Sequence, residues 1–165
     1  MADLAASATA SVSAAPERVW DLLCDTARYS EWVAGTEAVT RSDGPARPGS
    51  TYDEVNPILG PWKARSHWTV TEFDPPRRQV HRGGGLPLTS SFEVVMEVAA
   101  LGKSASEITI ALRGTAPGLL GDVFVRLMRG GVERDNEHTV RRLAELAATE
   151  LSAAPRPPAA PLPGR

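Results

Sequence analysis

Two polar side chains interrupt an apolar helical face near the end of the chain, and both are of types that hold ligands. Residues 119–151 show helical periodicity, and one stripe is apolar: Val125, Met128, Val132, Val140, Leu143, Leu146 and Ala147. Asn136 lies about 20° and Arg129 about 40° from the centre of that stripe. A buried amide or guanidinium without partners costs about 1–3 kcal/mol. The spacing therefore predicts a polar network or a polar ligand on the buried face.

A serine sits between two tryptophans on one face of a predicted strand over residues 62–73. Trp62, Ser66 and Trp68 alternate with charged and polar residues, which is typical of a strand with one face in the core. This face is expected to point inward, where Ser66 either donates a hydrogen bond to a ligand or simply packs in the core. A strand over residues 90–98 alternates in the same way, with Ser90, Phe92 and Met96 expected to point inward.

Two further strands carry chemically useful residues, but their orientation is left open by the pattern. Over residues 51–56, Tyr52 and Glu54 share one face, and an inward Glu54 could act as a general base. Over residues 79–82, Arg82 shares a face with Val80 and points inward if Val80 does. His81 is then expected to point outward.

Metal and triad chemistry is not supported by the spacing of the histidines. His67, His81 and His138 have no second ligand at a suitable offset on the same face, and no inward histidine supports Ser66. The single cysteine, Cys24, excludes an internal disulfide and a cysteine-built metal site. We expect no metal and no cofactor.

Composition limits the partners. The 165 residues carry a formal net charge of −2, with a pI near 5.9, which disfavours nucleic acid as a partner. No 18-residue apolar segment occurs, so no membrane insertion is expected. The first residues lack a basic and apolar leader pattern. We expect a cytoplasmic protein, either a monomer or a homodimer, that binds a hydrophobic small molecule.

The order of predicted elements is α+β. A strand over 5–13 precedes a helix over 16–25 and a helical turn over 27–32, and six strands separated by Gly and Pro turns then fill residues 39–116. Consecutive strands with short turns predict an antiparallel meander, whose apolar face the last helix covers. The domain is predicted over residues 5–151, with an extension over 1–4 and a disordered Pro/Ala-rich tail over 152–165.

This order resembles the helix-grip fold of the START-like, or SRPBCC, superfamily. Three stretches carry the resemblance: VSAAPERVWDLLCDTARYSEW (12–32), TVTEFDPPRRQVHR (69–82) and NEHTVRRLAELAATE (136–150). The resemblance implies a curved antiparallel sheet of about seven strands wrapped around a long C-terminal helix. Two short helices follow the first strand. It also implies a cavity for an apolar small molecule between sheet and helix.

Within the superfamily, the chain is similar to the polyketide cyclase/dehydrase branch. The segment WKARSHW (62–68) looks like the strand in which aromatase/cyclases carry a tryptophan, a serine and an arginine facing the pocket. Ser66 keeps the serine, whereas Trp68 replaces the arginine. Tyr29 and Trp32 fall in the aromatic-bearing helical segment of the family, and Asn136 resembles its pocket asparagine.

Three hypotheses follow for function. The first is a cofactor-independent cyclase or aromatase that orients a flexible, carbonyl-bearing apolar substrate. Its predicted catalytic residues are Asn136, Ser66 and Arg129. Its predicted substrate contacts are Trp62, Trp68, Phe92, Met96, Tyr29, Trp32, Val132, Arg82, Tyr52 and Glu54. The second is a non-catalytic carrier or sensor, and the third is a filled core without a ligand. Converging polar groups favour the first, and the absence of a cavity above about 300 Å³ favours the third.

Overall fold

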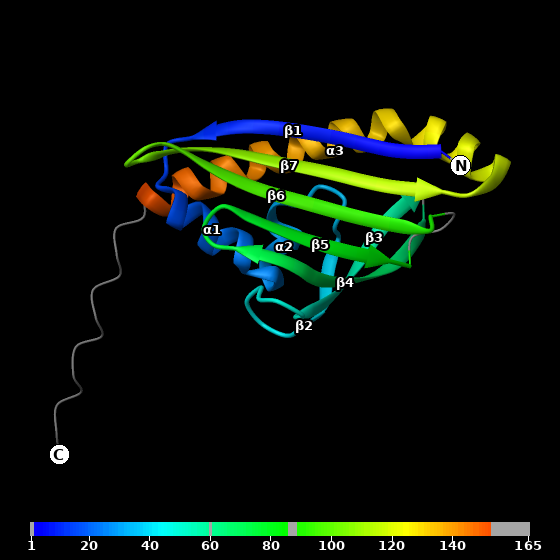
Figure 1. Cartoon of the computed structure of the whole chain (residues 1–165), viewed down its shortest axis with the longest axis horizontal. Helices are drawn as coiled ribbons and strands as arrows, with labels where there is room; N and C mark the ends of the chain where they lie inside the picture. Colours follow the sequence, from blue (N-terminus) through cyan, green and yellow to red (C-terminus); the bar gives the residue numbers. More distant parts are fainter. Residues whose placement is uncertain (1, 60, 86–88, 153–165) are drawn as a thin grey trace, which may run out of the picture.

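The chain forms one curved sheet that wraps a long helix (Figure 1). The computed structural model describes residues 2–59, 61–85 and 89–152. In chain order the elements are β1 (Ala2–Val12), α1 (Pro16–Cys24), the 3-10 helix η1 (Thr26–Arg28), α2 (Tyr29–Trp32), β2 (Ala38–Ser42), β3 (Thr51–Leu59), β4 (Trp62–Asp74), β5 (Arg78–Gly84), β6 (Ser91–Gly102), β7 (Ala105–Ala116) and α3 (Gly118–Ser152). The predicted helix-grip architecture, with six strands between α2 and α3, is confirmed.

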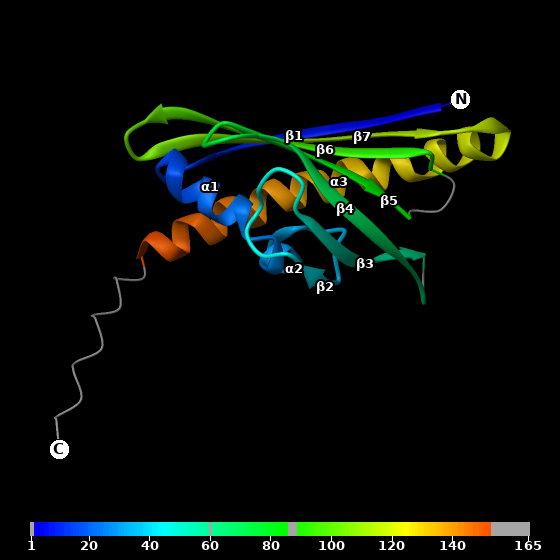
Figure 2. The ribbon, with the colours of Figure 1, turned by 60° about the horizontal axis from the view of Figure 1, so that its bottom comes forward.

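All seven strands belong to one sheet, in the order β1-β7-β6-β5-β4-β3-β2, with antiparallel neighbours. The sheet bends, so that β1 and β7 cover α3 while β2 and β3 fold down beside α2 (Figure 2). Alternation within the strands makes the concave face apolar, as Leu4, Ile110 and Val98 illustrate. A half-wet antiparallel sheet of this kind must cover its apolar face, and α3 does so.

The side-chain amide of Asn136 fastens α3 to the sheet. Its Nδ2 donates to the backbone oxygens of Ala6, at 3.1 Å, and Ile110, at 2.9 Å, on the neighbouring strands β1 and β7. The predicted stripe continues this contact toward the C-terminus through Val140 and Leu143, which are buried. Among the described residues, no helix combines the length and the apolar character that crossing a bilayer requires.

Helices α1 and α2 also pack on the concave side of the sheet. Pro16 occupies the first turn of α1, where a missing N–H is tolerated. The carbonyl of Leu23, near the end of α1, accepts hydrogen bonds from Tyr29 Oη at 2.7 Å and from Gln79 Nε2 at 2.8 Å. These bonds tie both short segments to β5 and so to the sheet.

Two expectations about the strands are corrected. Strand β1 begins at Ala2 rather than at residue 5, because Leu4 packs into the core. In β5 the inward residues are Gln79 and His81, while Val80 and Arg82 lie on the convex face. Pairing fixes this orientation, since Gln79 lies opposite Met96 on the inner face of β6.

Val80 is nevertheless buried on the convex face. It lies opposite Val95, and Arg78 and Arg82 flank it along β5. Arg78 pairs with Glu97 at 2.6 Å and Arg82 pairs with Glu93 at 3.2 Å. The aliphatic parts of these arginines cover apolar surface while their charged ends stay in water. The burial of Val80 therefore does not mark the concave side.

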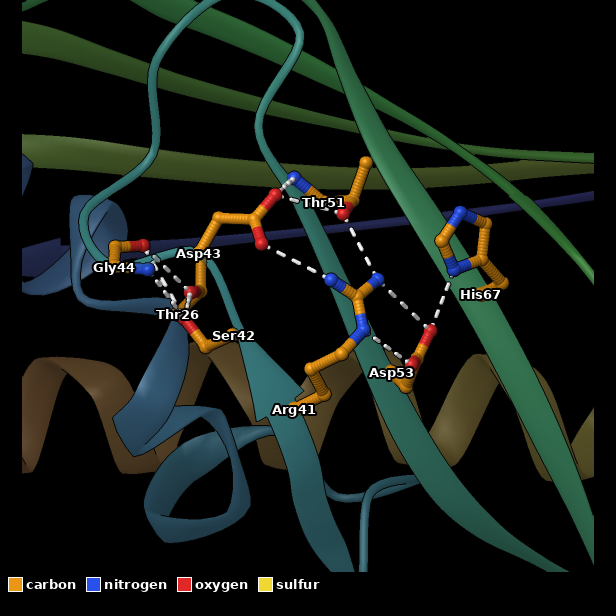
Figure 3. Close-up of polar contacts among 8 residues, drawn as sticks. All are labelled: Thr26, Arg41, Ser42, Asp43, Gly44, Thr51, Asp53 and His67. Atoms are coloured by element: carbon orange, nitrogen blue, oxygen red, sulfur yellow. Dashed lines mark hydrogen bonds and ion pairs between the residues drawn. The ribbon is translucent and has the colours of Figure 1, made fainter.

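A polar cluster on the convex face joins β2, β3 and β4 (Figure 3). Arg41 binds Asp53 at 2.7 Å and Asp43 at 3.0 Å, and His67 Nδ1 lies 2.5 Å from Asp53. Arg41, followed by His67, lowers the pKa of Asp53, and hydrogen bonds from Thr51 lower the pKa of Asp43. These groups lie at the surface and align the strands that carry the polar edge of the site.

Two glycines of α3 differ in how closely the rest of the protein packs against them. A Cβ on Gly121 would lie 2.7 Å from the carbonyl carbon of Ala116, whereas a Cβ on Gly130 would meet nothing within 4 Å. We therefore expect Gly121→Ala to destabilise the fold by roughly 1–3 kcal/mol. Gly130→Ala should stabilise it by up to about 1 kcal/mol, because alanine is the better helix former. Urea unfolding followed by circular dichroism measures both free energies of unfolding. Equal effects of the two substitutions would contradict the close contact between Gly121 and Ala116.

Candidate functional site

A cavity of about 170 Å³ lies between the concave face of the sheet and α3. The residues that line it come from β1, α2, β3, β4, β6, β7, α3 and the segments beside them. They are Leu4, Tyr29, Trp32, Val33, Gly35, Thr36, Tyr52, Glu54, Asn56, Pro57, Ile58, Trp68, Thr89, Phe92, Val94, Met96, Ile110, Leu112, Phe124, Met128, Val132, Asp135, Asn136 and Thr139. Most of them are apolar, as the resemblance implied.

Strand β3 supplies the polar edge of this cavity. Its alternation places Tyr52, Glu54 and Asn56 on the inner face, which settles the orientation that the sequence left open. Glu54 is only 4% exposed. Its Oε2 accepts a long hydrogen bond, 3.4 Å, from Asn56 Nδ2, which also donates to the Gly35 oxygen at 2.9 Å.

Burial decides the protonation of Glu54. Removing the carboxylate from water raises the pKa of Glu54 to about 7, and the polar groups of Asn56, Thr36 and Trp68 offset this only in part. The carboxyl group therefore changes between its acid and base forms near neutral pH. A group that does so can accept a proton in one step and return it in another.

Ser66 lies behind this edge rather than in the cavity wall. It is buried opposite Glu54, and its Oγ donates to Asn56 Oδ1 at 2.6 Å and accepts from Trp68 Nε1 at 2.9 Å. The inward orientation predicted for Ser66 is confirmed, but the residue is not part of the lining. Its contacts hold the Asn56 amide and the Trp68 indole in place.

Five aromatic rings form a continuous wall along the cavity. Neighbouring ring centroids are 4.8 Å apart for Tyr29–Trp32, 5.3 Å for Tyr29–Tyr52, 6.2 Å for Tyr52–Trp68 and 6.1 Å for Trp68–Phe92. All five belong to the lining. The predicted placement of these rings, and of Met96 and Val132, in one cavity matches the structure.

Two glycines let the rings lie against the sheet. Gly83 is paired with Trp68, and a Cβ there would lie 2.6 Å from the indole ring. Gly114 is paired with Phe92, and a Cβ there would lie 2.8 Å from its ring. A side chain at either glycine would push the ring into the cavity. The cavity therefore depends on glycine at these two positions.

His81 is the main interior residue that the sequence placed wrongly. It is fully buried, and its Nδ1 lies 2.9 Å from Tyr52 Oη. Burial lowers the pKa of His81 to about 4, so the imidazole is neutral at neutral pH. The alternation of β5 alone favoured an outward His81, because Val80 was the apolar residue of that strand. The pairing of β5 with β6 decides the matter.

Four residues expected to face inward do not. Trp62 is 76% exposed, because β4 runs past the edge of the cavity before it enters the core. Ser90 is exposed, just before β6, and bonds to Thr115. Arg82 lies on the convex face, for the reason given above. Arg129 is exposed, and its guanidinium donates to the Asp3 backbone oxygen of the edge strand β1, at 3.4 Å.

Asn136 belongs to the lining, but both of its amide bonds go to the backbone of β1 and β7. Thr139 is held similarly, since its Oγ1 accepts a hydrogen bond from the Ala34 amide at 3.0 Å. These helix residues thus fix the position of α3. Catalytic roles for Asn136, Ser66 and Arg129 stay predictions, and their contacts favour anchoring for all three.

The cavity is smaller than about 300 Å³, so by the volume criterion given above it favours the third hypothesis, a filled core without a ligand. A cavity of about 150 Å³ with apolar walls accepts one benzene molecule. A volume of about 170 Å³ therefore matches a single ring or a short chain. A larger occupant would require the walls to move apart.

In the described part of the chain, no three His, Cys, Asp or Glu side chains lie close enough together to hold a metal ion. Within the lining, the charged groups at neutral pH are carboxylates, from Glu54 and the exposed Asp135. The chemistry that these residues can perform is proton transfer at Glu54, assisted by hydrogen bonds from Tyr52 and Asn56.

The sequence supports a family assignment. Residues 3–148 match the family described as "Polyketide cyclase / dehydrase and lipid transport". The chain belongs to this family. The match spans every strand and most of α3, so it covers the elements that build the cavity.

Relatives and solved structures agree with the fold. An uncharacterised protein of Mycobacterium tuberculosis is 28% identical over 144 residues, which are 84% of this chain and 94% of that protein. The Zhui aromatase/cyclase from Streptomyces sp. R1128 superposes with a TM-score of 0.78 at 18% identity, covering 93% of this chain and 98% of that one. The di-domain ARO/CYC StfQ from the steffimycin biosynthetic pathway gives 0.72 at 12% identity, over 91% and 52%. At these identities the structures establish the helix-grip fold alone.

The raised pKa of Glu54 predicts how stability depends on pH. An acid whose pKa is about 7 when folded and 4.5 when unfolded binds more protons in the folded state between these values. The free energy of unfolding should therefore fall as pH rises through this window, by about 3 kcal/mol. Glu54→Gln should remove this fall. Urea unfolding at pH 5, 6.5 and 8 measures it, with the exposed lining residue changed by Asp135→Asn as a control. Parallel pH curves for wild type and Glu54→Gln would contradict the burial of an ionisable carboxyl.

Proposed function

We propose that the protein is a cofactor-independent cyclase that uses Glu54 to move a proton during ring closure of a carbonyl-bearing apolar chain. One observation carries this proposal: the only fully inward carboxyl group of the described lining lies in an apolar cavity with a pKa of about 7. Enzymes raise carboxyl pKa values in this way when a carboxylate must act as a base at neutral pH. Membership of the cyclase/dehydrase family supports it.

In the proposed reaction, the Glu54 carboxylate removes a proton from a carbon between two carbonyl groups of the substrate. The resulting enolate carbon attacks a second carbonyl of the same chain, which forms one C–C bond and an alkoxide. In this step His81 Nδ1 donates to Tyr52 Oη, which leaves the Tyr52 hydroxyl hydrogen for one of these oxygens. Asn56 Nδ2 keeps its bond to the Gly35 oxygen and turns its other hydrogen from Glu54 to the substrate. Protonated Glu54 then returns its proton to the alkoxide, so the closure conserves all atoms.

Loss of water would complete the ring. The Glu54 carboxylate removes a second proton from the carbon next to the one that bears the new hydroxyl, and protonated Glu54 then donates this proton to the hydroxyl, which leaves as water while a C=C bond forms. The rings of Tyr29, Trp32, Trp68 and Phe92 would hold the chain in a folded shape, so that the reacting carbons meet. A group that takes a proton and gives it back needs a pKa near the working pH, which Glu54 has.

The volume limits the substrate to a chain that closes a single ring. A short linear β-polyketone thioester is the matching probe, because it is neutral and carries no anion beside Glu54. A carrier of hydrophobic molecules, the second hypothesis, would bind such a compound without changing it. The two functions therefore differ in turnover and not in binding.

We expect Glu54→Gln to lower the rate of cyclisation at least about 100-fold, since it removes the proton acceptor and keeps the shape. In the wild type, kcat/KM should rise with pH and level off above a pKa of about 7. Chromatography of the cyclised product at fixed times measures both. Asp135→Asn, which changes an exposed carboxylate of the same lining, should keep the wild-type rate.

Two results would contradict the proposal. One is an unchanged rate and pH profile in Glu54→Gln with the fold intact by circular dichroism. The other is saturable binding of the probe without any turnover, which would make the protein a carrier. Ser66→Ala should lower the rate only modestly, because Ser66 holds Asn56 and Trp68 and does not line the cavity.

A further inference from the structure

The charged residues that line the cavity are all acidic. In the part of the lining that the structure describes, Glu54 and Asp135 are acidic, and no lysine, arginine or histidine is present. His81 lies behind Tyr52 and is neutral, because burial lowers its pKa to about 4. Burial likewise raises the pKa values of Tyr29 and Tyr52 well above their ordinary range, so both phenols stay protonated.

The Glu54 carboxylate lacks a charged partner among the described residues, although the polar groups of Asn56, Thr36 and Trp68 lie beside it. Its hydrogen bond from Asn56 Nδ2 is 3.4 Å long, near the limit for such a bond, and no ion pair to Glu54 is formed within the described residues. Buried charges in proteins are usually paired or neutralised. Glu54 can be neutralised by a proton, or a cation can enter the cavity and pair with it.

The walls beside Glu54 suit an organic cation. Tyr52 and Trp68 are paired across β3 and β4 next to Glu54 and Ser66, and Tyr29 lies 5.3 Å from Tyr52. Aromatic rings attract an ammonium group through their electron-rich faces, by about 0.5–2 kcal/mol each. The remaining walls, formed by residues such as Ile110, Phe124 and Met128, would cover a hydrocarbon portion.

We propose that the cavity binds an apolar molecule that carries a protonated amine, with the ammonium group paired to the Glu54 carboxylate among the rings of Tyr29, Tyr52 and Trp68. The volume of about 170 Å³ limits the rest of the molecule to one ring or a short chain. Organic acids of the same shape would place a second negative charge beside Glu54 and be rejected. Amine binding depends on the charges of the lining and does not require the protein to catalyse cyclisation. The proposal of amine binding and the proposal of a cyclase can therefore fail separately.

Three compounds of one shape test the proposal by isothermal titration calorimetry on the full chain: 2-phenylethylamine, 2-phenylethanol and phenylacetate. At pH 8 the amine is protonated and Glu54 is mostly ionised. We expect the amine to bind at least about tenfold more tightly than the alcohol, and phenylacetate to bind more weakly than both. At pH 5.5, where Glu54 is mostly protonated, the preference for the amine should shrink to less than about threefold.

Glu54→Gln should abolish the preference for the amine and change the affinity for the alcohol by less than about threefold. Asp135→Asn should keep the preference, which separates the buried carboxylate from the exposed one. The proposal is overturned if the amine binds no better than the alcohol, or not at all at millimolar concentration. It is also overturned if phenylacetate matches the amine, or if the preference survives in Glu54→Gln.

Discussion

Taking the carboxyl group of Glu54 out of water is the interaction on which the site depends. A carboxylate in an apolar environment loses its hydration, and this loss is recovered only by a proton, a cation or strong hydrogen bonds. The surroundings of Glu54 offer a long hydrogen bond from Asn56, the polar groups of Thr36 and Trp68, and no cation among the described lining residues. The group therefore holds its proton up to about neutral pH, since burial raises its pKa to about 7.

Contacts elsewhere in the fold shape the apolar cavity around Glu54. Asn136 ties α3 to β1 and β7, and the cavity lies between this helix and the concave face of the sheet. Gly83 and Gly114 let the Trp68 and Phe92 rings lie against the sheet instead of in the cavity. Ser66 holds Trp68 from behind. Each of these contacts is remote from any reacting atom, yet each affects the volume or the polarity that Glu54 experiences.

The architecture was predictable from the sequence because the spacing of apolar residues and the positions of Gly and Pro turns can be recognised within short stretches of the chain. Alternation in residues 62–73 and 90–98 gave the inner faces of β4 and β6, and the helical stripe gave the buried face of α3. In β5 the prediction failed because pairing between strands decides the outcome. Val80 is apolar but lies on the convex face, since Gln79 and His81 pair with the inward residues of β6, so His81 points inward and Arg82 outward. No pattern within residues 79–82 contains that information.

The candidate site was predictable in part, for a related reason. Tyr52 and Glu54 were recognised as a pair on one face, but a strand of alternating polar residues does not reveal which face is buried. Arg129 lay near the predicted stripe, and the helix angle alone could not show that its side chain is exposed and reaches the backbone of the edge strand β1. The cavity volume depends on how rings lie on glycines of neighbouring strands, which is a property of the folded sheet.

The ionisation of Glu54 can be measured directly. Glutamate labelled with ¹³C at the side-chain carboxyl carbon, observed by NMR from pH 3 to 9, gives one titration for each glutamate, and Glu54→Gln identifies the resonance of Glu54. The structure predicts a pKa of about 7 for this resonance. A Glu54 carboxyl that titrates near 4.5 would show that water reaches it, and it would contradict the buried carboxyl on which both the proposed chemistry and the proposed ligand rest.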